Sequence, residues 1–309
     1  MTHYAVRVRA LRKRYRETVA VDGVDLDIRS GEVFGILGPN GAGKSTTVAL
    51  LRGHRTRDGG EVAVLGEDPE RAGRDWLARI GVVWQDESAA EELTVAETVR
   101  HFARYYPRPR DPDEVIALVG LEAEADSRSK HLSGGGRRRL DVALGVIGDP
   151  ELLLLDEPTA GLDPVARRRF QRLVRALADR GTTVVLTTHD LEEAERLADR
   201  LAVISAGRVR AVGAPATLAG RDEREAVVRW REPDGAEREA VTGTPTSEVA
   251  ALAARFGGEV PGLRVSRPTL EDVYLRLVGQ DGQDGQDGQD GQDGPAPVVP
   301  GSGAGEWAP

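Results

Sequence analysis

Short apolar runs alternate with amphipathic helical stretches over residues 1–220 of the chain. Four of these runs carry almost no charged side chains: Val33–Leu37, Ile80–Trp84, Leu152–Leu155 and Thr183–Leu186. Continuous apolar runs of this length are typical of strands that are buried on both faces, as in a parallel sheet covered by helices. The alternation therefore predicts an α/β fold, and the carboxyl ends of the four strands are expected to meet at one crevice.

A helical subdomain is predicted between Gln85 and Ser133, where the strand pattern disappears. The apolar positions of Val95–Tyr106 and Pro112–Val119 recur at helical spacing. We therefore expect a helical subdomain at about residues 86–135, inserted into the part of the chain that forms the sheet.

The pattern changes after Gly220, where short strands and helices form a small α+β arrangement. The turn sequence Pro233-Asp234-Gly235 separates two strand-like runs, which predicts a hairpin. The whole of residues 221–279 is therefore expected to be an accessory domain. Its predicted elements are strands at Ala226–Arg231 and Ala236–Val241, a helix at Ser247–Phe256, a strand at Leu263–Val265 and a last helix that begins at Thr269 and ends near Gly279.

Residues 280–309 have a composition that does not support a packed core. Five tandem Gln-Asp-Gly triplets occupy residues 280–294, and Pro, Gly and Ala dominate the remainder. Such segments bury too little apolar surface to offset the entropy of ordering, so we expect a disordered tail. Aspartate at every third residue could also form a weak Ca²⁺ site, but a solvated repeat is the favoured interpretation.

The composition excludes several classes of function. The 309-residue chain contains no cysteine, which rules out disulfides and thiolate metal sites, and its five histidines are scattered. A net charge of −9 argues against a nucleic-acid partner. Arg7 and Arg9 alternate with Val6, Val8 and Ala10, which favours the solvated face of a strand. No apolar run approaches the roughly 18 residues needed to span a bilayer, and no signal-peptide region is present at the N-terminus.

The segment Gly38-Pro-Asn-Gly-Ala-Gly-Lys-Ser45 fits the phosphate-loop pattern G-x-x-x-x-G-K-[ST] and is followed by a helical run at Thr46–Leu51. In such a loop, backbone N–H groups at a helix N-terminus point at phosphate oxygens, the lysine reaches the β- and γ-phosphates, and the hydroxyl ligates Mg²⁺. Asn40 is the one asparagine in the chain, so an N-K-x-D motif for guanine recognition is excluded. The residues expected to bind the nucleotide are Gly38, Pro39, Asn40, Gly41, Ala42, Gly43, Lys44, Ser45 and Thr46.

Further motifs narrow the class of nucleotide enzyme. They are Leu132-Ser-Gly-Gly-Gly136, Leu152-Leu-Leu-Leu-Asp156-Glu157, Ala160-Gly-Leu-Asp163 and Leu186-Thr-Thr-His189. In this order and spacing the motifs resemble those of the ATP-binding cassette family, over roughly residues 4–220. The resemblance implies an ATP-binding domain at residues 1–220 with the P-loop NTPase fold, comprising a RecA-like core, an antiparallel β subdomain and the inserted helical subdomain.

The resemblance also implies a role for each motif residue in ATP hydrolysis. Asp156 would hold Mg²⁺ together with Ser45, and Glu157 would be the general base for the attacking water. His189 would contact the γ-phosphate, and Gln85 would sense it through the metal ion or the water. The remaining residues are the signature Leu132, Ser133, Gly134, Gly135 and Gly136, the D-loop residue Asp163, and Tyr15, which would stack on adenine.

These assignments have simpler alternatives when each residue is considered alone. Asp156-Glu157 could be a turn at the end of a strand, Gln85 and His189 could be ordinary polar residues, and Tyr15 could be a structural aromatic.

Gly136 departs from the commonest form of the signature, in which glutamine or another long side chain occupies this position. Ser133 and the N–H groups of Gly134 and Gly135 remain available as donors. A glycine near a helix start costs up to about 1 kcal/mol relative to alanine. We therefore expect a slightly loosened signature helix and a modest change in ATPase activity when Gly136 is replaced by Gln.

The resemblance implies two partners. In ATP-binding cassettes the signature of one copy completes the phosphate site of another, so the chain is expected to form a head-to-tail dimer with ATP between the copies. The family also places the contact with a separate transmembrane permease near Gln85–Thr94 and the helical subdomain. The chain is then a peripheral protein on the cytoplasmic face of the cell membrane.

The last helical segment refines the functional expectation. Arg267-Pro-Thr-Leu-Glu-Asp-Val-Tyr-Leu-Arg-Leu-Val-Gly279 is similar to the C-terminal region of ATP-binding subunits of daunorubicin/doxorubicin-resistance multidrug exporters. This similarity implies efflux of a drug-like or other small hydrophobic molecule. An importer or lipid-transport cassette remains an alternative, as does a soluble cassette protein that acts on ribosomes or DNA.

Overall fold

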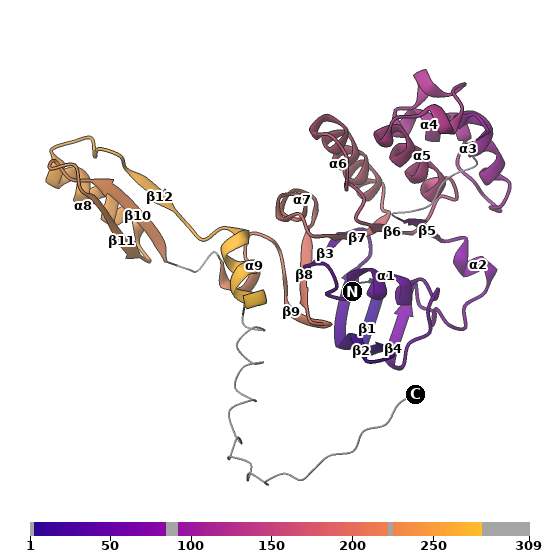
Figure 1. The fold of residues 1–309 in the computed structure, drawn as a ribbon, viewed down its shortest axis with the longest axis horizontal. Helices are drawn as coiled ribbons and strands as arrows, with labels where there is room; N and C mark the ends of the chain where they lie inside the picture. The colour runs from indigo at the N-terminus through magenta and orange to yellow at the C-terminus, as the bar shows by residue number, and fades with distance from the viewer. Residues whose placement is uncertain (1–2, 85–91, 222–224, 280–309) are drawn as a thin grey trace, which may run out of the picture.

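The computed structural model describes residues 3–84, 92–221 and 225–279. The tail at residues 280–309 and Gln85 lie outside the described residues. Figure 1 shows a large body, which we call the cassette, and a slender extension formed by residues 226–266, which we call the arm.

A six-stranded sheet runs through the middle of the cassette. It consists of β3 (Val33–Leu37), β5 (Ile80–Val83), β6 (Leu152–Asp156), β7 (Thr183–Thr188), β8 (Arg200–Ser205) and β9 (Arg208–Gly213). The order is β5-β6-β7-β3-β8-β9, and every neighbouring pair is parallel except β8 and β9. In β6, Leu153 and Leu155 pack into one apolar cluster and Leu152 and Leu154 into another. Both faces of the sheet are therefore covered, which confirms the predicted α/β fold.

An antiparallel sheet covers one face of the central sheet. Its strands are β1 (Tyr4–Tyr15), β2 (Thr18–Arg29) and β4 (Gly59–Val64), in the order β2-β1-β4. Its buried side chains share an apolar cluster with α1 (Lys44–Leu51) and with β3 and β6. The predicted alternation of buried and exposed residues in β1 holds only as far as Val8, where the pairing with β2 shifts register. Ala10 has φ 47° and is exposed, and Leu11 is buried in the core in its place.

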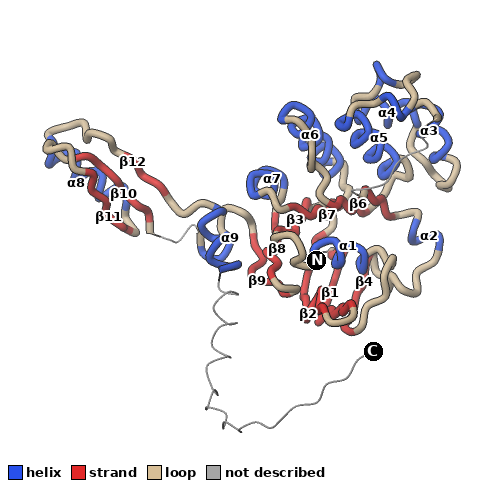
Figure 2. Tube along the Cα trace, in the orientation of Figure 1, coloured by secondary structure: helices blue, strands red, loops and turns tan. Residues whose placement is uncertain are grey.

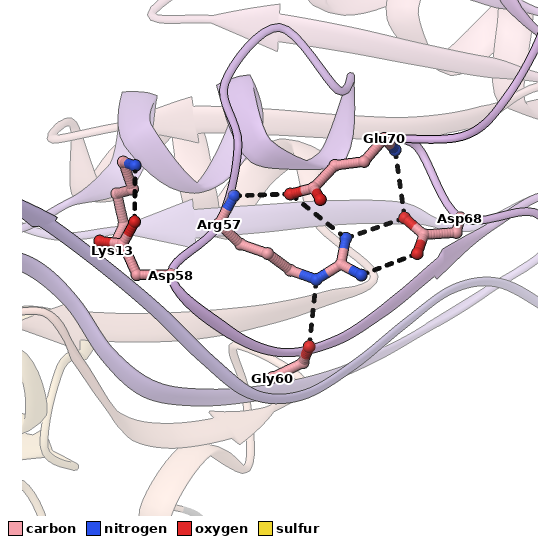
Figure 3. Close-up of polar contacts among 6 residues, drawn as sticks. All are labelled: Lys13, Arg57, Asp58, Gly60, Asp68 and Glu70. Carbon is pink, nitrogen blue, oxygen red and sulfur yellow. Dashed lines mark hydrogen bonds and ion pairs between the residues drawn. The ribbon is translucent and has the colours of Figure 1, made fainter.

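A network of ion pairs centred on Arg57 fastens the loop after α1 to the loop after β4 (Figure 3). The Arg57 guanidinium donates to the two carboxylate oxygens of Asp68 at 2.8 and 2.7 Å, and the Arg57 N–H donates to Glu70 at 2.6 Å. These contacts hold the pKa of Asp68 down at about 2. Beside them, Lys13 pairs with Asp58 at 2.9 Å and so fastens β1 to the same loop.

Helices α5 (Gly134–Val146) and α6 (Pro164–Asp179) cover the other face of the central sheet, and α3 (Val95–Ala103) and α4 (Pro112–Val119) pack against them. Helix α7 (Leu191–Leu197) lies beside β3 and β7, and the short α2 (Arg74–Leu77) precedes β5. A capping box formed by Thr94 and Glu97 begins α3. This helix ends at Ala103 rather than at Tyr106 as predicted, and Pro107 follows shortly afterwards.

The arm has a small apolar core of its own. Strands β10 (Ala226–Arg231), β11 (Glu237–Thr242) and β12 (Arg264–Ser266) form an antiparallel sheet in the order β11-β10-β12, and α8 (Pro245–Phe256) lies against it (Figure 2). The described residues of the arm that are buried in this cluster are Val228, Trp230, Leu252 and Val260.

Helix α9 (Leu270–Gly279) returns to the cassette. Thr269 and Asp272 cap its start reciprocally, at 2.7 and 3.2 Å. Leu270 and Val273 are buried in a cluster with Ala194 of α7 and Leu201 of β8. The last helix of the sequence therefore packs in the core of the cassette, whereas residues 226–266 pack among themselves.

Within residues 3–84, 92–221 and 225–279, none of the helices combines the length and the apolar character needed to cross a bilayer.

Candidate ATP-hydrolysis site

The loop from Gly38 to Gly43 joins the end of β3 to the start of α1 at the centre of the sheet. A side chain at Gly38 would collide with the carbonyl oxygen of Ile204 in β8. Gly43 has φ +99°, and a side chain there would collide with the carbonyl oxygen of Ala20 in β2. Close backbone packing therefore requires glycine at positions 38 and 43, and this packing holds the loop against both sheets.

Lys44 is the first residue of α1 and is 4% exposed. Its ammonium donates to the carbonyl oxygens of Gly38 and Pro39 at 2.8 and 3.1 Å. It also lies 3.3 Å from the carboxylate of Glu157, which follows β6. The lysine therefore sits between the phosphate loop and the carboxylate that the sequence assigns as general base.

Glu157 connects the lysine to the predicted switch histidine. Its Oε1 atom lies 3.2 Å from Nδ1 of His189, which follows β7 and has a side chain 55% exposed. Burial pushes the pKa of Glu157 upward, but the hydrogen bond from His189 and the charge of Lys44 outweigh burial, so the pKa is lower than usual. The carboxylate is consequently ionised at neutral pH, as a general base must be.

Asp156 and Ser45 provide adjacent oxygen atoms for a metal ion. The Ser45 hydroxyl donates to Oδ1 of Asp156 at 3.0 Å, and Asp156 is 5% exposed at the end of β6. Mg²⁺ prefers such hard oxygen donors, and it is commonly held by one or two protein groups together with substrate phosphates. The pair therefore fits Mg²⁺, with Ser45 and Asp156 as the side chains that would hold it.

Thr187, the neighbour of Asp156 in the sheet, was not predicted from the sequence. Its hydroxyl donates to Oδ1 of Asp156 and accepts from the backbone N–H of Glu157 at 3.0 Å. Glu157 itself has φ 43°, a conformation that is uncommon for a residue with a side chain. Thr187 thus orients the carboxylate of Asp156 and holds the backbone of Glu157. The sequence does not single it out, because β7 also contains Thr183 and Thr188.

Arg138 of α5 is the second residue that sequence reasoning missed. It is 9% exposed, and its guanidinium donates to the backbone carbonyl oxygens of Trp84, Asp156 and Pro158. It joins the signature helix to the turn that carries Glu157 and to the end of β5. A signal was present, because Arg138 shares a helix face with the apolar Val142 at a spacing of one turn.

The signature residues form the start of α5. Ser133 is the N-cap, and its hydroxyl oxygen accepts from the N–H of Gly136 at 3.1 Å. A Cβ at Gly136 would lie 3.2 Å from Cβ of Leu132, and one at Gly135 would lie 3.4 Å from Cβ of Ala166 in α6. Glycine at position 136 therefore lets Leu132 pack closely, whereas a longer side chain would have to displace it by a few tenths of an ångström.

The other predicted site residues lie at element ends. Asp163 caps α6 by accepting from the N–H groups of Val165 and Ala166 at 2.8 and 2.9 Å. Tyr15 ends β1, is 41% exposed and has Lys13 Nζ 5.5 Å from its ring centroid. Its stacking on adenine stays a prediction, as does the role of Gln85, which lies outside the described residues.

Comparisons with known proteins agree with this geometry. Residues 21–160 match the family model described as ABC transporter. The chain is 39% identical over 304 residues to the Nod factor export ATP-binding protein I of Rhizobium sp. (strain N33), which covers 91% of this chain and 99% of the relative. It is 41% identical over 302 residues to the protein of the same name from Ralstonia nicotianae, with 89% and 94% covered. The chain therefore belongs to the ATP-binding subunits of ABC transporters.

The solved structures that resemble this chain belong to the same family. The cbiO1 protein of Clostridium perfringens, part of the ABC transporter complex cbiONQ, superposes with a TM-score of 0.63 at 31% identity over 69% of this chain and 90% of that chain. A dimeric ATP-binding cassette in a post-hydrolysis state with ADP and Pi gives a TM-score of 0.61 at 27% identity, covering 68% and 98%. The protein is accordingly an ATPase that uses ATP and Mg²⁺ and belongs to a transporter.

Proposed function

We propose that the chain is the ATP-hydrolysing subunit of an exporter, acting as a dimer beneath a separate membrane subunit. The observation that carries the ATPase part is the cluster of Lys44, Ser45, Asp156, Glu157 and His189 at the ends of three neighbouring strands. Their contacts of 3.0 to 3.3 Å join the phosphate loop, a pair of oxygen donors and an ionised carboxylate.

The chemistry follows from these side chains. Lys44 places positive charge where the terminal phosphates meet the loop. Mg²⁺ held by Ser45 and Asp156 would supply further positive charge for the phosphate oxygens. Glu157 accepts the proton of the attacking water because Lys44 and His189 keep it ionised. His189, with a side chain 55% exposed, keeps its opposite ring nitrogen available for the γ-phosphate. In-line attack then yields ADP and phosphate.

Dimerisation would add hydrogen-bond donors on the exposed side of the phosphate loop. Ser133 and the first N–H groups of α5 form a helix N-terminus suited to an anion. In the proposed head-to-tail dimer these groups of one copy grip the γ-phosphate held by Lys44 of the other. Hydrolysis releases the grip and so opens the dimer.

Export is supported by the relatives, which are similar along nearly the whole chain, the arm included. Two of them, at 39% and 41% identity, carry a name that specifies export. We extend this direction of transport to the present chain and propose a small hydrophobic molecule, of the kind handled by drug exporters, as the transported class.

A groove of about 510 Å³ supports docking of a membrane subunit. It lies between α2, β5 and the helical subdomain, and its lining includes Trp84, the last described residue before the predicted contact segment Gln85–Thr94. Leu77 and Tyr105 line it with side chains 47% and 70% exposed, and Arg52 and Asp141 add charge. An apolar groove with a polar rim fits an amphipathic helix, so we propose that a cytoplasmic helix of the permease occupies it.

Transport in inside-out membrane vesicles tests the proposal. The chain is co-expressed with the membrane protein that copurifies with it, and ATP-driven accumulation of fluorescent daunorubicin is measured. We expect uptake with the natural chain and none with Glu157→Gln. ATPase activity that the permease stimulates without any uptake of daunorubicin would leave the motor intact and reject this substrate class.

Copurification with the permease tests the groove. Leu77→Arg is expected to reduce the permease recovered by tenfold or more, because it places a charge on an apolar contact. Leu275→Arg is the matched control, since Leu275 is 59% exposed on α9, away from the groove. Equal recovery with both variants would contradict docking at this groove.

A further inference from the structure

A groove rich in arginine lies on the outside of the cassette between α6 and α7. It has a volume of about 500 Å³, and four arginines line it: Arg168, Arg172 and Arg175 from α6, and Arg196 from α7. It is separate from the phosphate loop and from the groove beside α2. Neither ATP hydrolysis nor permease docking, as argued above, uses it.

The positive charge of the groove is only partly compensated. Arg175 pairs with Asp199 at 2.8 Å, and Arg196 pairs with Glu192 at 2.7 Å. Asp179 also lines the groove. Among the described residues, Arg168 and Arg172 have no hydrogen-bond or ion-pair partner, and both are exposed. They lie one helical turn apart, so two uncompensated guanidinium groups face the same side of α6.

The chain itself contains a segment of complementary charge. Residues 280–294 carry five aspartates, at positions 281, 284, 287, 290 and 293, and no cation. An extended chain places aspartates of successive triplets about 10 Å apart. Arg168 and Arg175, seven residues apart on one helix face, are separated by a similar rise of about 10 Å.

The attachment point of this segment also favours the groove. The segment follows directly after α9, whose side chains pack with Ala194 and Ala198 of α7. Arg196, on the same short helix, lines the groove. Fifteen extended residues can reach about 50 Å, so the segment is long enough to reach the groove from the end of α9.

We propose that the Gln-Asp-Gly segment of the chain docks in the arginine groove of the same molecule. Its aspartates pair with Arg168 and Arg172. They also contact the guanidinium groups of Arg175 and Arg196, each of which already has one carboxylate partner. The groove is then occupied in the free chain, and an external anionic partner must displace the segment to bind there.

Fluorescence energy transfer in the full chain tests the proposal. The natural sequence has no cysteine, so Ala176→Cys in the groove and Gly288→Cys in the segment provide two defined labelling sites. The nine residues from Gly279 to Gly288 span at most about 30 Å, so the donor–acceptor pair must be one whose transfer is efficient only near contact. With such a pair we expect high transfer efficiency at 20 mM salt and a loss of at least half of it at 1 M salt, where the Debye length falls to about 3 Å. Efficiency that does not change with salt would overturn the proposal.

Charge reversal assigns the contact to particular residues. Arg168→Glu with Arg172→Glu should lower the transfer efficiency as far as high salt does. Arg104→Glu with Arg108→Glu is the matched control, because both residues are exposed in the loop after α3 and lie outside the groove. Replacing the five segment aspartates by lysine on the Arg168→Glu, Arg172→Glu background should restore high efficiency. Equal losses in the two double variants, or no restoration, would contradict the proposal.

Two further outcomes would assign the groove to a different occupant. Transfer between donor-only and acceptor-only molecules that rises with protein concentration would show docking between copies. Binding of phosphatidylserine vesicles that requires Arg168 and Arg172 and is unchanged when the chain ends at Gly279 would show a membrane site. Either result would reject docking within one molecule. Circular dichroism and ATPase activity are measured for each variant to establish that it is folded.

Discussion

The cassette and the arm are built from the same kinds of elements but differ in how completely they bury them. Every residue of β6 and β7 is buried, whereas every residue of β12 is exposed. The cassette can therefore hold carboxylates and a lysine in fixed positions, because packed neighbours surround the backbone that carries them. The arm depends on a few apolar residues and on exposed ion pairs, which contribute little stability.

Because the cassette holds its side chains more rigidly than the arm, we expect ATP hydrolysis to depend on residues of the cassette. Glu157→Gln is expected to lower the steady-state rate of phosphate release by about 10²–10⁴-fold, because an amide cannot accept a proton from water. Glu192→Gln, on the exposed side of α7, should stay within about twofold of the natural rate. A Glu157→Gln protein that keeps a tenth of the natural activity would show that another group is the base.

Helix α9 follows the arm in sequence but belongs to the cassette by packing. Leu270→Ala is expected to reduce the free energy of unfolding by about 2–5 kcal/mol, since Leu270 is 1% exposed. Leu275→Ala, at a site 59% exposed on the same helix, should change it by less than about 0.5 kcal/mol. Thermal unfolding followed by circular dichroism measures both, and similar effects would place α9 outside the core.

The arm should unfold without the cassette. Trp230→Ala removes the largest side chain of the arm's core, so we expect fast amide exchange over residues 226–266. The ATPase rate and the unfolding temperature of the cassette should remain unchanged. A loss of cassette stability comparable to that of Leu270→Ala would show that the two regions fold as one unit.

The smallest predicted difference between the cassette and the arm is in how one glutamate of each region makes stability depend on pH. Burial raises the pKa of Glu193 in α7 above its ordinary value of 4.5, and the hydroxyls of Thr188 and Thr159 only partly oppose this shift. In the arm, the hydrogen bond from Trp230 lowers the pKa of the partly exposed Glu232. The two carboxylates therefore contribute to stability with opposite dependence on pH.

The direction of the pH dependence for Glu193 follows because its pKa is higher in the folded protein than in the unfolded chain. Its contribution to stability is fully present below pH 4.5 and is lost as the pH rises through the higher folded pKa. Glu193→Gln should therefore raise the unfolding temperature at pH 8 by on the order of 2 °C and leave it unchanged at pH 4. An equal change at both pH values would attribute the effect to packing instead of ionisation.

The sequence predicted the elements of the cassette well because their signals are local. The phosphate loop, the polar residues after buried strands and the helices between Gln85 and Ser133 are each encoded within a few neighbouring residues. The fold class was confirmed for this reason.

Contacts between distant elements could not be predicted in this way. Thr187 orients Asp156 from the neighbouring strand, and Arg138 reaches three carbonyl groups from α5. Helix α9 was grouped with the arm because it follows the arm in the chain, yet its apolar face matches α7 and β8. Such contacts depend on the assembled sheet, which no local pattern describes.

The central claim is that Lys44 of one copy and Ser133 of a second copy hold the same ATP. The most direct measurement is the molar mass of Glu157→Gln in saturating ATP and Mg²⁺, by light scattering on a sizing column. We predict twice the chain mass with ATP, the single mass without it, and the single mass again when Ser133→Arg is added. A Glu157→Gln protein that remains a monomer in saturating ATP and Mg²⁺ would contradict the account.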